Sequence, residues 1–162
     1  MTGSAAGGQR AASSAQARQD IAALQAALAA EQAASYGYGV VGSHLTGSRF
    51  TSATADCVAH ERARDALTAM IAARGGRPGP AAAAYQLPIT VTTDKQAIAL
   101  AIMLERQATA AYLGLVAAAD PALRTFAAQN MRDAAVREAR WSDRPQAFPG
   151  LQASSLRPAR RD

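Results

Sequence analysis

The chain has 162 residues and a net charge of +5, and it contains no apolar run near the roughly 20 residues that a membrane-spanning helix needs. Alanine is abundant and only 5% of residues are aromatic, which favours a single all-helical domain over one rich in β-strands. Because the 17 basic residues are scattered through the predicted helices, the positive charge does not indicate a nucleic-acid partner.

The first predicted helix follows a segment without pattern. Residues 1–16 are rich in Gly, Ser and Ala and have no hydrophobic period, so we predict a disordered N-terminal tail. From residue 17 onward, apolar side chains recur at spacings of three and four, which predicts a helix that ends between Gly42 and Leu45. The apolar stripe of this helix also carries Glu31 and Tyr38.

The second predicted helix covers residues 51–74, and the Gly-Gly pair that follows is typical of a helix C-terminus. Its predicted buried stripe contains Glu61 and Arg64. Residues 75–92 then contain three prolines and no helical period. Because connections in compact bundles are usually shorter, this segment predicts a long crossover between two helical hairpins.

The last two helices have clear start signals. Thr93 and Gln96 have the spacing of a capping box, which predicts a third helix that begins at Thr93 or Asp94. Asp120 is followed by proline, which is typical of a helix start and predicts the fourth helix there. This helix must end before Pro145, because the residue before a proline avoids helical geometry.

These elements predict a four-helix bundle over residues 17–144, followed by an irregular basic tail over residues 145–162. Each predicted helix carries one of the four glutamates of the chain on its apolar stripe, namely Glu31, Glu61, Glu105 and Glu138. Tyr38 and Tyr112 each stand seven residues after a glutamate, so the two halves are similar to a duplicated hairpin. One carboxylate from each helix, directed at a common core, is the arrangement of a carboxylate metal site.

The four glutamates and the long connection between Glu61 and Glu105 resemble the ferritin-like superfamily. Residues 29–39 (AAEQAASYGYG) and 60–64 (HERAR) are also similar to an uncharacterised ferritin-like domain family with no assigned function. The superfamily resemblance implies a four-helix bundle around two metal ions. In that site the first and third helices each supply a Glu, and the second and fourth each supply a Glu-x-x-His pair.

The histidines that this pattern implies are missing. The positions three residues after Glu61 and Glu138 hold Arg64 and Trp141, and neither side chain can be a metal ligand. His60 precedes Glu61 by one residue, which places it about 100° around the helix, so we assign it to the rim or surface of the bundle.

We therefore favour a metal-free core in which Arg64 pairs with glutamates and the tyrosines donate hydrogen bonds to carboxylates. The predicted polar network consists of Glu31, Glu61, Arg64, Glu105, Glu138, Tyr38 and Tyr112. No catalytic residue is assigned. The alternative is a carboxylate oxidase or ferroxidase in which the four glutamates hold two iron or manganese ions, since oxygen ligands suit hard cations.

The expected role is binding or assembly, as a homodimer formed through helix faces. A protein partner could also dock on the basic C-terminal tail. The single Cys57 excludes an intramolecular disulfide and is expected to act as a small buried hydrophobe. The chain begins without the apolar stretch of a secretory signal, so we expect a cytoplasmic protein.

Overall fold

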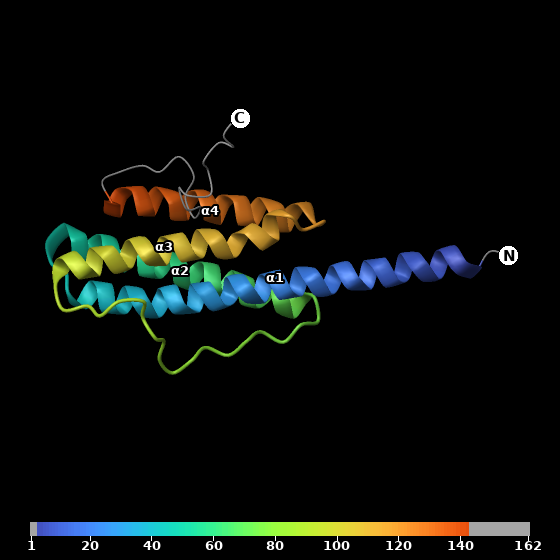
Figure 1. The fold of residues 1–162 in the computed structure, drawn as a ribbon, viewed down its shortest axis with the longest axis horizontal. Coiled ribbons are helices and arrows are strands. Elements are labelled where there is room, and N and C mark those ends of the chain that lie inside the picture. Colours follow the sequence, from blue (N-terminus) through green and yellow to red (C-terminus); the bar gives the residue numbers. More distant parts are fainter. Residues whose placement is uncertain (1–2, 143–162) are drawn as a thin grey trace, which may run out of the picture.

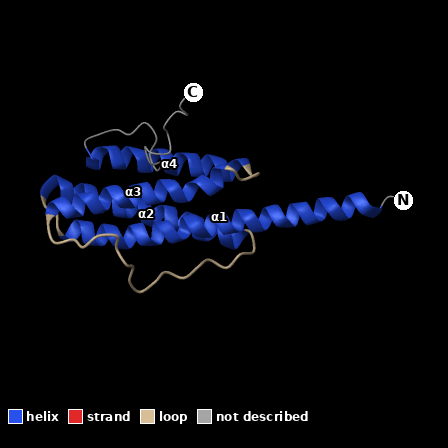
Figure 2. Cartoon of the chain, viewed as in Figure 1, coloured by secondary structure: helices blue, strands red, loops and turns tan. Residues whose placement is uncertain are grey.

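The computed structural model describes residues 3–142, with side chains from residue 13 onward, and within this range it contains four helices and no strand (Figures 1 and 2). The helices are α1 (Gly3–Ser43), α2 (Gly47–Ala73), α3 (Asp94–Val116) and α4 (Pro121–Ser142). α1 packs along α2 and α3, and α3 packs along α4. The predicted all-α four-helix bundle is therefore confirmed. The extended segment between α2 and α3 is the predicted crossover (Figure 1).

Local signals explain where several helices begin and end. The Thr93 side chain accepts a hydrogen bond from the backbone N–H of Gln96, and α3 starts at the next residue. Asp120 accepts from the backbone N–H of Ala122 at the start of α4. Gly75, just after α2, has a φ of +73°, a conformation that glycine adopts at little cost. These ends agree with the sequence-based prediction.

The N-terminal segment differs from the prediction. α1 extends back to Gly3, although we expected a disordered tail over residues 1–16. The segment contains several alanines, and lengthening an existing helix adds a hydrogen bond per residue without a new nucleation step. This part of α1 projects beyond the other helices (Figure 1). The predicted basic tail at residues 145–162 lies outside the described residues.

The core consists of two apolar clusters, one toward each end of the bundle. One contains Leu24, Leu28, Leu67, Ile71, Leu115 and Leu123, and the other contains Val41, Leu45, Leu100, Leu104 and Trp141. Along each helix, buried polar residues stand between the residues of the two clusters. The candidate site lies in this polar layer. Within residues 3–142, no helix is both long and apolar enough to cross a membrane.

Candidate functional site

The face of α2 that enters the core differs from the predicted face by about one residue. Its buried residues are Ala53, Asp56, His60, Ala63, Leu67 and Ile71. Leu67 and Ile71 are the large aliphatic side chains of this face, and His60 stands two turns before Leu67 on the same side. Burial of these aliphatic groups therefore sets the rotation of α2 and turns His60 inward.

This rotation corrects two predictions. Glu61 is only half-buried, so it does not join the other three glutamates in the core. Arg64 bonds to its exposed neighbour Asp65, with 2.8 Å between Nε and Oδ1, and not to a glutamate of another helix. The assignment of His60 to the rim was also wrong, since this residue is 1% exposed.

His60 lies between two carboxylates from different helices. Its Nδ1 atom is 2.6 Å from Oε2 of Glu31, and its Nε2 atom is 3.1 Å from Oε1 of Glu105. Burial alone would lower the pKa of His60, but the hydrogen bonds and charges of Glu105 and Glu31 outweigh it and raise the pKa to about 9. At neutral pH the ring is therefore an imidazolium that donates to both carboxylates.

The two buried tyrosines make a reciprocal pair of bonds between α1 and α3. Tyr38 of α1 donates to Oε1 of Glu105 across 2.6 Å, and Tyr112 of α3 donates to Oε1 of Glu31 across 2.7 Å. Burial and the neighbouring carboxylates raise the pKa of both phenols, so they remain protonated donors. The structure thus brings both predicted tyrosines to the predicted glutamates of the opposite helix.

Two arginines join α3 to α4 in a second reciprocal pattern. Arg137 of α4 donates through Nε to Oε1 of Glu105 at 2.9 Å, and Arg106 of α3 donates through Nε to Oε1 of Glu138 at 2.7 Å. On α3 the glutamate precedes the arginine, and on α4 the arginine precedes the glutamate. Because the two helices are antiparallel, this order allows two adjacent ion pairs to form between them. Burial would raise the pKa of Glu105, but His60 and Arg137 lower it, so the carboxylate is ionised.

A further buried carboxylate, Asp56, links α2 to α4. Trp141 donates from Nε1 to Oδ2 of Asp56 at 2.8 Å, and Arg140 donates from Nη2 to the same oxygen at 2.6 Å. Trp141 occupies the position where the superfamily pattern implies a histidine, and its indole N–H satisfies a carboxylate. Sequence reasoning missed Asp56, although it stands one helical turn before His60.

These contacts do not fit a two-metal centre. Glu105 gives one oxygen to three donors, from Tyr38, His60 and Arg137, and two of these donors are cationic. Neither an imidazolium nor a guanidinium has a lone pair for a metal. Within the described part of the chain, no group of three or more His, Cys, Asp or Glu side chains could hold a metal ion. The second oxygens of Glu105 and Glu138 are buried and have no hydrogen-bond partner among the described residues.

Comparisons with known proteins agree with the fold. A family model described as Domain of unknown function (DUF4439) matches residues 23–153. A crystal structure described as a conserved hypothetical protein, rv2844, from Mycobacterium tuberculosis is similar, with a TM-score of 0.76 and 34% identity. This match covers 78% of the present chain and 96% of that one. No curated protein matches the chain.

Proposed function

The chain belongs to the family described as Domain of unknown function (DUF4439), and we propose that it is a metal-free ferritin-like domain that acts in binding or assembly. The observation that carries this proposal is the position of His60 between Glu31 and Glu105, with both ring nitrogens engaged. In a carboxylate metal centre, metal ions supply the positive charge among the glutamates. Here the protonated ring of His60 and the guanidinium of Arg137 supply it.

The charges of the core support a vestigial metal site. An incoming divalent cation would have to displace the His60 proton, whose pKa of about 9 opposes its loss at neutral pH. It would also meet Arg137, which is effectively always protonated. The side chain of Arg137 is 15% exposed and contacts Glu105 directly, so this positive charge lies in the network itself.

A buried network of this kind is suited to holding four helices in one arrangement. His60 connects α2 to α1 and α3, and Arg137 connects α4 to the same carboxylate of α3. Glu31, His60 and Glu105 are at most 1% exposed, so these side chains do not face solvent in this arrangement. Function would then reside on the outer helix faces, where Phe50 and Val58 of α2 are exposed, and we place the proposed homodimer contact there.

The second candidate is an oxidase or ferroxidase with two iron or manganese ions. The observation that favours it is the pair of buried oxygens without a hydrogen-bond partner, Oε2 of Glu105 and Oε2 of Glu138. Buried polar atoms usually have a partner, so these two oxygens are the natural donors for a bound cation.

Elemental analysis of the purified full chain, together with oxygen uptake after addition of ferrous iron, distinguishes the two candidates. We expect no stoichiometric iron or manganese and no iron-dependent oxygen consumption. One or two metals per chain, lost in Glu105→Gln but retained in the half-buried control Glu61→Gln, would establish the oxidase instead. Sedimentation of the same preparation tests the homodimer, and a monomer at high concentration would contradict assembly with itself.

A further inference from the structure

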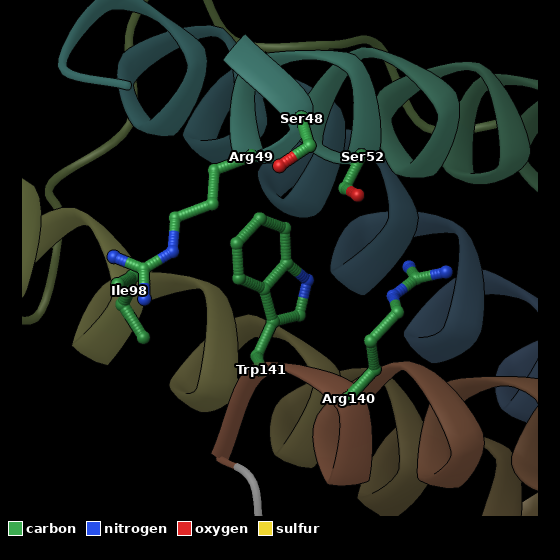
Figure 3. Close-up of a pocket in the computed structure, with 6 residues that line it drawn as sticks. All are labelled: Ser48, Arg49, Ser52, Ile98, Arg140 and Trp141. Atoms are coloured by element: carbon green, nitrogen blue, oxygen red, sulfur yellow. The ribbon is translucent and has the colours of Figure 1, made fainter. Parts of the chain in front are cut away.

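A cavity of about 120 Å³ lies at the end of the bundle where α2 begins and α4 ends. Its lining residues are Ser48, Arg49 and Ser52 of α2, Ile98 of α3, and Arg140 and Trp141 of α4 (Figure 3). A water molecule in the liquid occupies about 30 Å³, so there is room for a small molecule and not only a single water. Two of the six lining residues are arginines and none is acidic.

Several donors at this cavity are not used within the protein. Among the described residues, the guanidinium of Arg49 has no ion-pair or hydrogen-bond partner, and neither hydroxyl of Ser48 and Ser52 makes a hydrogen bond. Arg140 bonds to Asp56 through Nη2 alone, so its other N–H groups remain free of partners in this part of the chain. Figure 3 shows Arg49 and Arg140 on opposite sides of the Trp141 indole, with the two serines above it.

The positive charge at this cavity favours an anion as its ligand. Asp56 offsets the charge of Arg140, which leaves the charge of Arg49 unbalanced at the cavity. Guanidinium and hydroxyl groups together favour carboxylate or phosphate oxygens, to which their hydrogen bonds are charge-assisted. The indole of Trp141 and the side chain of Ile98 add an apolar surface beside these donors.

We propose that this cavity binds a small organic anion. Its carboxylate or phosphate group is held by Arg49 with the hydroxyls of Ser48 and Ser52, and its apolar part lies against Trp141. The proposal does not rest on the metal-free core, because among the described residues Arg49 and both serines form no hydrogen bond or ion pair with the His60 network.

The single tryptophan of the chain reports directly on this site, because Trp141 lines the cavity. The full chain is titrated with phenyl phosphate and with benzoate, and indole fluorescence is measured at an excitation that these ligands do not absorb. Inorganic phosphate tests the anion without an apolar part, and benzylamine tests the apolar part with a positive charge. We expect saturable changes with phenyl phosphate or benzoate, weaker binding of inorganic phosphate, and none of benzylamine. The stronger of the first two identifies the acid group.

Arg49→Gln should weaken binding at least tenfold, because it removes a charge-assisted contact. Arg62→Gln is the matched control, since Arg62 is also exposed on α2 and lies outside this cavity. It should leave the affinity unchanged, and both variants should keep the thermal midpoint of the parent chain. Equal weakening in the two variants would mean that binding depends only on the net charge of the protein, and it would overturn the proposal. Absence of a saturable change with every anion would also overturn it.

Discussion

The imidazole of His60 in α2 donates to the carboxylate of Glu31 in α1 across 2.6 Å, with both side chains buried. A buried ion pair adds little net stability, because desolvation of the two charges offsets their attraction. Removal of one partner is nevertheless costly, because the other charge remains buried. The free energy of unfolding is therefore most sensitive to truncation of one of the two residues.

His60→Ala should lower the free energy of unfolding by about 3–5 kcal/mol, because Glu31 and Glu105 would lose their shared cationic donor. Urea unfolding followed by circular dichroism measures the change. Arg64→Ala is the control, since the ion pair of this side chain is with its exposed neighbour Asp65, and its effect should stay below about 0.5 kcal/mol. A larger loss in Arg64→Ala than in His60→Ala would contradict the observed rotation of α2.

Stability should depend on pH through His60. Its pKa is raised from 6.5 to about 9, so its contribution is fully present below pH 6.5 and is lost as the pH rises through about 9. We expect the free energy of unfolding to fall by on the order of 3 kcal/mol over this window. His60→Gln should flatten the profile, whereas His44→Gln should preserve it, because the His44 ring bonds to Ser43 and the backbone of Val40 and, among the described residues, to no carboxylate.

The acid side of the same profile reports on Glu105. Its pKa is lowered by His60 and Arg137 against the effect of burial, so its contribution is present above its ordinary pKa of 4.5. Stability should therefore decline as the pH falls below about 4.5. A profile that stays level from neutral to strongly acidic pH would mean that folding does not lower the pKa of Glu105.

The two arginines that join α3 and α4 should contribute unequally to the stability of the fold. Arg137→Met should destabilise the protein by about 2–4 kcal/mol, because its largely buried side chain balances the charge of Glu105. Arg106→Met should cost less than Arg137→Met, because the Arg106 side chain is 44% exposed and solvent screens its pair with the buried Glu138. Thermal unfolding of the two variants measures both losses of stability. Equal losses would contradict the prediction.

Local signals made much of the fold predictable. The starts of α3 and α4 depend on contacts within a few residues, at Thr93 and Asp120, and such contacts can be recognised in the sequence. The N-terminal extension of α1 was missed because its small residues have no apolar stripe, although alanine favours helix. A periodic stripe shows which residues pack, and its absence does not exclude a helix.

The candidate site was predictable in its residue types and less so in its geometry. Glu31, Glu105 and the two tyrosines lie on unambiguous stripes, and the structure brings them together. On α2, two faces are possible: one carries Glu61 and Arg64, and the other carries Asp56 and His60. The two faces differ by one residue along the sequence, so the apolar pattern alone could not show which one is buried. Packing of Leu67 against the other helices determines which face is buried.

The missing nitrogen ligands suggest a last experiment, because His60 and Arg137 are equivalent in the two halves of the chain. They stand 77 residues apart, as do Glu61 and Glu138, and both bond to Oε1 of Glu105. Arg137→His would therefore replace a permanent cation by a second imidazole beside the core carboxylates. We expect this variant to bind cobaltous ion, with visible d–d absorption, and to gain thermal stability when cobalt is added.

The control for this gain is Arg137→Gln, which removes the same charge without adding a ligand and should take up little cobalt. A second comparison is Arg64→His with Trp141→His, placed where the superfamily pattern puts its histidines. This double variant should bind none, because the side chain at position 64 faces Asp65 at the surface and loss of Trp141 removes a donor to Asp56. If a folded Arg137→His variant bound no metal, replacing the guanidinium with a second imidazole would not restore a site, and the proposed vestigial-site account would have to be abandoned.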